Sequence, residues 1–133
     1  MVADALQYVY LIKTMLPQLI QRESQRSGLL IVSSGLGSFP CCGWLCLSIV
    51  KSLQSFLGQG LSYELRHKVD VTSFECGEVV TQTNNHPVSF FRCMPEVATK
   101  AALRDMGKEA VTCGTWRQEF RMWSRAAFMT ESI

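Results

Sequence analysis

Apolar and polar residues are spaced along this chain in ways that predict both helices and strands. Residues 4–22 carry apolar side chains every three or four positions, the spacing of an amphipathic helix, although Pro17 should kink or divide it. Residues 44–66 show the same spacing and predict a second helix, with Gly58 and Gly60 weakening its middle. We therefore expect two long helices in the first part of the chain.

Two short segments predict strands. Residues 29–33 are apolar up to their last residue, Ser33, which is typical of a strand covered on both faces in a parallel sheet, and residues 69–74 alternate well enough to form a second strand. Further helices are expected over residues 96–107 and 116–129. The order helix, strand, helix, strand, helix is that of an α/β protein with a parallel sheet. Because only two strands are evident, this sheet should be part of a larger fold.

Composition adds limits to this picture. With 133 residues, of which 47% are hydrophobic and 18% charged, the chain has enough apolar side chains for a packed core and should form one domain over residues 1–133. A formal charge of +2, with Lys and Arg scattered rather than clustered, argues against nucleic acid as a partner.

The cysteines do not follow the pattern of a disulfide framework or a metal site. The sequence has no C-x-x-C pair, and His67 and His86 lack metal-ligand spacing to any cysteine. Buried, reduced thiols are the better interpretation, and they indicate an intracellular, reducing compartment. This expectation applies to Cys41, Cys42, Cys46, Cys76, Cys93 and Cys113.

Residues 27–50 contain no charged side chain, so a membrane span over residues 29–50 is one alternative. Glycine and proline near the middle of this run favour a loop between a buried strand and a buried helix. These residues are Gly35, Gly37, Pro40 and Gly43. Membrane association is therefore not favoured, and the N-terminal residues lack the cleavage site of a signal peptide.

The glycines after the first strand do not make a dinucleotide fingerprint. Gly35 and Gly37 follow a strand, but Pro40 stands where the third glycine should be. Taken alone, Ser34 is a turn or cap residue and Lys51 is a surface lysine on a helix. Only the spacing between these two residues gives a reason to consider them as parts of a catalytic site.

Ser33, Ser34 and Gly35 follow an apolar strand, and Pro40, Lys51 and a long amphipathic helix come after them. This order resembles the short-chain dehydrogenase/reductase family, in particular its 17β-hydroxysteroid dehydrogenase and very-long-chain 3-ketoacyl reductase branch. The resemblance covers residues 1–110 and corresponds to the C-terminal half of the family's domain, with residues 111–133 as a C-terminal amphipathic helix. It implies a partial Rossmann-like, doubly wound parallel sheet with flanking helices, from which the first half of the fold is absent.

The resemblance assigns roles to several residues. Ser34 matches the catalytic serine and Lys51 the catalytic lysine, while Asp4 lies near the asparagine position. Leu47 occupies the place of the tyrosine, which acts as general acid and base in the family. Because leucine cannot give or take a proton, the resemblance implies a catalytic site without its proton donor.

The resemblance also implies how a nicotinamide cofactor would be held. Lys51 would hold the ribose, and Gly77, Val79 and Thr81 lie in a loop similar to the family's P-G-x-V-x-T motif, with Cys76 in place of proline. NADP or NAD, steroid or fatty-acyl substrates, and the cytosolic face of the endoplasmic reticulum follow from the resemblance only. For this chain by itself we expect no cofactor, since no nucleotide fingerprint is present.

Three hypotheses follow. The first is a degenerate, truncated dehydrogenase-like protein, inactive in hydride transfer by itself, that forms a homodimer or a heterodimer with full-length relatives through helices 4–22 and 44–66. The second is an NAD(P)-dependent oxidoreductase whose nucleotide-binding half lies outside this sequence. The third is a small membrane protein that spans the bilayer through residues 29–50.

Overall fold

The structure is a computed structural model that describes residues 2–23, 25–82 and 87–130. It consists of four α-helices, three strands and one 3₁₀ turn within those residues. In chain order these are α1 (Val2–Ile20), β1 (Ser27–Ser34), the 3₁₀ turn η1 (Gly35–Gly37), α2 (Leu45–Glu64), β2 (Val69–Cys76), α3 (Pro95–Asp105), β3 (Val111–Thr112) and α4 (Trp116–Thr130).

The three strands form one parallel sheet in the order β1-β2-β3. β1 and β2 pair over eight residues, from Ser27 opposite Val69 to Ser34 opposite Cys76. The parallel α/β architecture is therefore confirmed. The sequence prediction missed β3, which pairs only at Ser73 and Phe74, because a strand of two residues has no periodicity to detect.

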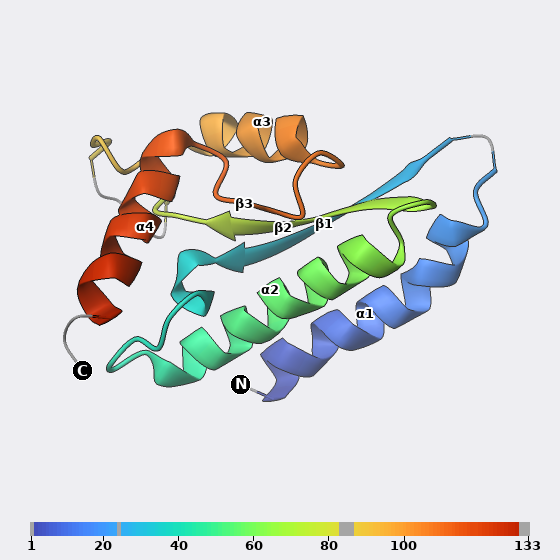
Figure 1. Cartoon of the computed structure of the whole chain (residues 1–133), viewed down its shortest axis with the longest axis horizontal. Helices are drawn as coiled ribbons and strands as arrows, with labels where there is room; N and C mark the ends of the chain where they lie inside the picture. Colours follow the sequence, from blue (N-terminus) through green and yellow to red (C-terminus); the bar gives the residue numbers. More distant parts are fainter. Residues whose placement is uncertain (1, 24, 83–86, 131–133) are drawn as a thin grey trace.

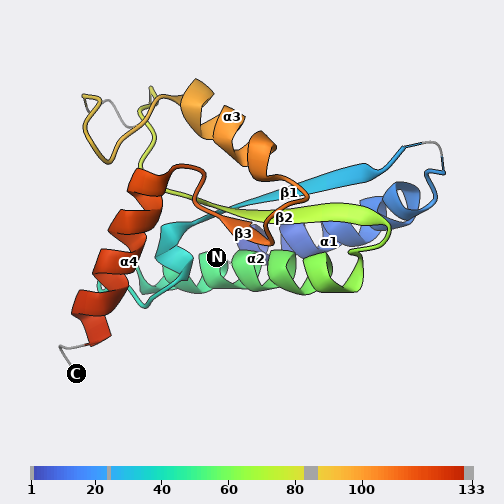
Figure 2. The same cartoon turned by 45° about the horizontal axis from the view of Figure 1, so that its top comes forward.

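Helices cover both faces of the sheet (Figures 1 and 2). α1 and α2 lie side by side on one face and α3 lies on the other, while α4 stands beside the carboxyl ends of the strands. The core is divided in the same way. Ile12 of α1 packs with Ile31, Val69 and Val71 of the sheet on one face, and Phe74 packs with Ala98 of α3 on the opposite face.

Pro17 and Gly58 both lie inside helices that continue past them. Pro17 does not divide α1, which continues to Ile20: its missing N–H removes one hydrogen bond, and its carbonyl still accepts one from the N–H of Gln21 at 3.0 Å. Gly58 also lies where α2 approaches the sheet closely. A Cβ atom there would lie 2.9 Å from Cβ of Ser73, so a side chain would push the helix away from β2.

The uncharged residues 27–50 form β1, η1, a loop and the first turns of α2 rather than one helix. Among the residues that the structure describes, no helix combines the length and apolar character needed to cross a membrane. The prediction of buried thiols is wrong in part. All six cysteines are free and Cys113 is buried, but Cys42 and Cys46 are exposed at the loop and at the start of α2.

The amphipathic helix expected near the C-terminus is present as α4 but begins only at Trp116, and residues 131–133 of the expected range 111–133 lie outside the described residues. Strand β3 comes first, and Gly114, with a φ of +82°, turns the chain into α4. A side chain at Gly114 would also meet the ring of Phe74, so glycine is required there on two grounds.

Candidate functional site

The N-terminal halves of α1 and α2 enclose a pocket of about 420 Å³. Three of the residues predicted from the sequence, Asp4, Leu47 and Lys51, line it together. Residues four apart on a helix lie on the same face. Leu47 and Lys51 of α2 therefore line the pocket together, and so do Asp4 and Tyr8 of α1. The pocket is further lined by Gln7, Cys46, Val50 and Gln54.

Lys51 is held at both its backbone and its side chain. Its ammonium group donates a hydrogen bond to Oε1 of Gln54 at 3.0 Å, and Gln54 is buried. Its carbonyl oxygen accepts a hydrogen bond of 2.7 Å from the hydroxyl of Ser33 at the end of β1. The lysine is thus fixed against the sheet, and a neutral amide takes part of its hydrogen-bonding capacity.

Ser34 is not among the residues that line this pocket. It lies at the end of β1, where its hydroxyl oxygen accepts a hydrogen bond of 3.3 Å from the N–H of Leu36 and caps η1. The turn then packs tightly against α2, since a Cβ on Gly37 would lie 2.7 Å from the carbonyl carbon of Lys51. Ser33 and Gly37, on either side of Ser34, therefore contact α2 at Lys51, while the side chain of Ser34 caps the turn.

A buried carboxylate, which sequence reasoning missed, joins these elements. Glu75 near the end of β2 accepts hydrogen bonds from the hydroxyls of Ser38 and Ser55, at 2.8 and 2.5 Å. It therefore links β2 to the loop after η1 and to α2. The sequence did offer a signal for it. A glutamate inside the apolar and hydroxyl-rich strand 69–76 would be buried and would therefore need hydrogen-bond donors around it.

The thiols near this end of the sheet are not activated. Burial, and then the nearby charge of Glu75, raises the pKa of Cys113 to about 12, and burial also raises the pKa of Cys76. A thiol is a nucleophile only as the thiolate, so neither side chain is suited to covalent catalysis at neutral pH.

The residues that the resemblance assigns to the cofactor lie in the segment after β2. Gly77 packs against α4, where a Cβ atom would come within 2.8 Å of the amide carbon of Gln118. Val79 forms an isolated parallel bridge with Cys93, and Thr81 is exposed. The space beside Gly77 is therefore filled by this chain's own side chain.

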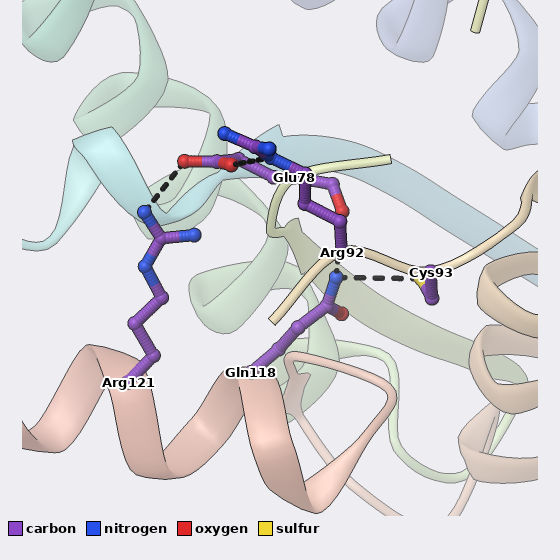
Figure 3. A network of polar contacts seen from close by, with 5 residues as sticks. All are labelled: Glu78, Arg92, Cys93, Gln118 and Arg121. Carbon is purple, nitrogen blue, oxygen red and sulfur yellow. Dashed lines mark hydrogen bonds and ion pairs between the residues drawn. The ribbon is translucent and has the colours of Figure 1, made fainter. Parts of the chain in front are cut away.

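An ionic network ties this segment to α4 (Figure 3). The carboxylate of Glu78 pairs with Nη2 of Arg121 at 2.6 Å and with Nε of Arg92 at 2.7 Å. The hydrogen bond from Arg121, supported by Arg92, lowers the pKa of Glu78 to about 2 despite the opposing effect of burial. Gln118 donates from Nε2 to the carbonyl of Glu78 and to the sulfur of Cys93. This network fixes α4 against the chain that leaves β2.

The chemistry that the pocket can perform is limited by position 47. Leu47 is about one-third exposed and offers no ionisable group beside the lysine. The pocket does contain a phenol, but it belongs to Tyr8 of α1. Sequence reasoning missed Tyr8 and Gln54 because their approach to Lys51 depends on how the helices pack.

No family model matches the chain, and no curated protein matches it. Solved structures do. A 7β-hydroxysteroid dehydrogenase matches with a TM-score of 0.71 and 18% identity, over 93% of this chain and 51% of that protein. The alcohol dehydrogenase of Comamonas testosteroni that is specific for bulky-bulky ketones matches with a TM-score of 0.68 and 21% identity. This match covers 98% of the present chain and 51% of the alcohol dehydrogenase chain. The chain spans about half the length of these dehydrogenases, and over that half it shares their fold.

Proposed function

We propose that this chain is a dehydrogenase-fold protein that does not transfer hydride by itself and that works by pairing with another protein chain. The observation that carries the first part is the pocket shared by Asp4, Leu47 and Lys51. A lysine and a carboxylate are kept there around a leucine that cannot transfer a proton. Loss of general acid–base catalysis lowers rates by roughly 10²–10⁴.

The segment after β2 supports the same conclusion. The nicotinamide cofactors that the resemblance implies would need room beside Gly77, and Gln118 fills that space. The ammonium of Lys51, which would hold the ribose, already donates to Gln54. These residues do not fit a nicotinamide group as they stand, so we derive no reaction step through it.

Calorimetry and a rate assay test this proposal together. NADH and NADPH are each titrated into the chain, and cofactor oxidation is followed with a steroid ketone and a 3-ketoacyl thioester. We expect no heat and no turnover. Measurable turnover would overturn the proposal and favour the oxidoreductase hypothesis, in which case Tyr8→Phe identifies the proton donor if it abolishes the rate.

The second part of the proposal is supported by the outer surface of α1 and α2. Both helices expose large apolar side chains: Leu6, Val9, Tyr10, Leu11 and Met15 on α1, and Leu45, Ile49, Leu53, Phe56 and Tyr63 on α2. A depression of about 510 Å³ lies among Val9, Leu53 and Phe56. Exposed apolar side chains gathered around such a depression mark interaction sites. We propose that a second chain covers it, either another copy or a full-length relative.

Sedimentation velocity over a hundredfold range of concentration tests this pairing. Phe56 is 75% exposed, so Phe56→Asp should weaken the complex by tenfold or more without disturbing the core. Phe120→Asp is the matched control, because Phe120 is also exposed but lies on α4. If the chain alone stays monomeric, a copy is excluded as the partner. If a co-expressed full-length relative also fails to bind, pairing is excluded altogether.

A further inference from the structure

A second cleft, of about 600 Å³, lies away from the pocket of Lys51. It is formed by α3, the first turn of α4 and residues 90–93, and α3 covers the opposite face of the sheet from α1 and α2 (Figure 2). Its volume is in the range of pockets that bind small organic molecules. None of the residues considered in the sequence analysis as catalytic or cofactor-binding lines it.

Aromatic rings form one wall of this cleft. The ring of Phe90 packs edge-on against Phe91 at 5.0 Å and against Trp116 at 5.8 Å between centroids. Phe90 and Trp116 are nevertheless more than half exposed, while the methyl group of Ala101 is buried in the wall beside them. Fixed rings with open surface offer contact area to a planar apolar molecule at little entropic cost.

Positive charge without a matching negative charge lines the same cleft. Four basic side chains contribute, and two of them are neutralised: Arg92 by Glu78 and Arg104 by Asp105. Within the described residues, the side chains of Lys100 and Arg117 have no hydrogen-bond or ion-pair partner.

Arg117 is held in place by the aromatic wall, since its guanidinium lies 4.7 Å from the ring centre of Phe90 and 5.6 Å from that of Trp116. Glu119 is the one acidic side chain among the described residues that line the cleft, and its charge acts on Arg104. The uncompensated charge of the wall is therefore positive.

The start of α4 adds polar groups to this wall. The N–H groups of Gln118 and Glu119 donate to the carbonyl of Thr115, both at 3.0 Å, and the helix presents its positive N-terminal end to the cleft.

We propose that this cleft binds a small organic anion with a planar aromatic or fused-ring body, whose acidic group is held by Lys100 and Arg117. The aromatic wall accounts for the planar body, and the two unpaired cations account for the charge. A carboxylate, a sulfate and a phosphate share the required chemistry. The site does not depend on the pocket of Leu47 or on hydride transfer.

Two probes with the same ring test the proposal, 2-naphthalenesulfonate and the neutral 2-naphthalenemethanol. Each is titrated into the isotope-labelled chain, and amide chemical shifts locate the site. We expect shifts from the sulfonate to gather in residues 90–93 and 115–119 and around Lys100. Lys100→Gln combined with Arg117→Gln should weaken the sulfonate by tenfold or more and change the affinity of the alcohol by less than twofold.

Lys13→Gln combined with Arg22→Gln is the matched control, because both side chains are exposed and far from the cleft in the fold. It removes the same charge and should leave both affinities unchanged. Shifts that gather on α1 and α2, an equal loss of affinity in the control, or undiminished sulfonate binding after removal of Lys100 and Arg117 would each overturn the proposal. If the double variant fails to fold, Lys100→Gln alone still has to weaken the sulfonate.

Discussion

At the scale of single residues, Leu47 and Lys51 define what the pocket between α1 and α2 can do. The two side chains are four positions apart on one helix and line the same pocket. A phenol at position 47 would therefore sit beside an ammonium group, and a nearby positive charge favours the ionised form of a phenol. The missing chemistry can be restored and measured without any cofactor.

For this reason Leu47→Tyr should introduce a phenol whose pKa lies about one unit below the ordinary value near 10. Absorbance at 295 nm as a function of pH measures it, with the wild-type titration subtracted. Adding Lys51→Gln should return that pKa to its ordinary value. A phenol that titrates normally with Lys51 in place would show that position 47 does not face the lysine.

The charge of Glu78 contributes to the stability of the fold through its two arginine partners. Its pKa is lowered from 4.5 to about 2, first by Arg121 and then by Arg92. The stabilisation is therefore fully present above pH 4.5 and is lost as the pH falls from 4.5 towards 2. Because the side chain is about one-third exposed, solvent screening reduces its contribution to about 1 kcal/mol.

Glu78→Gln should accordingly lower the free energy of unfolding by about 1 kcal/mol at pH 7 and by much less at pH 2. Urea unfolding followed by tryptophan fluorescence measures both values. The control is Glu23→Gln, an exposed residue before β1, which should have no effect at either pH. An equal loss for Glu78→Gln at both pH values would contradict the ionic explanation.

Sequence reasoning located part of the site and missed the rest for a physical reason. Asp4, Leu47 and Lys51 were found because their spacing along the chain resembles a known pattern. Tyr8 and Gln54 enter the pocket only because α1 packs beside α2, and Glu75 becomes a buried link only once two serines reach it. Tertiary packing decides such contacts, and local periodicity does not encode it.

At the scale of elements, the contact of α2 with β2 depends on one of its two glycines. A Cβ on Gly58 would lie 2.9 Å from Ser73, whereas a Cβ on Gly60 would meet nothing within 4 Å. Both positions lie inside the same helix and gain the same helix propensity from alanine, about 1 kcal/mol. Any difference between them therefore reports how closely the helix packs on the sheet.

Gly60→Ala should raise the free energy of unfolding by up to about 1 kcal/mol, because it removes backbone freedom from the unfolded chain. Gly58→Ala should lower the free energy of unfolding by about 1–2 kcal/mol, because the cost of the new contact with Ser73 exceeds the gain in helix propensity. Thermal unfolding of the two variants side by side measures both effects. Equal stabilisation by the two substitutions would mean that α2 moves away from β2 at no cost.

Periodicity was enough to place all four helices and the two long strands in the right order. It failed where an element is too short to show a period, as in β3, and where burial depends on the neighbouring element. Cys46 illustrates the second case, since it lies in an apolar run and is nevertheless exposed at the start of α2, where it lines the open pocket.

At the scale of the whole molecule, the sheet has an unpaired edge. β2 lies between β1 and β3, but among the described residues no strand pairs with the outer edge of β1. Val32 on this strand is 45% exposed, against the expectation of a strand covered on both faces. An open edge of eight residues and the apolar faces of α1 and α2 are thus two different surfaces on which another chain could add.

Amide hydrogen exchange distinguishes these two surfaces. In the monomer, alternate amides of β1 point away from β2 and should exchange at least about 100-fold faster than the amides of Thr72, Ser73 and Phe74, which lie in the centre of the sheet. If chains pair through α1 and α2, raising the concentration should slow exchange in those helices and leave the edge of β1 fast. Slowing of the β1 amides instead would show that pairing adds a strand to the sheet, and would contradict the helical interface.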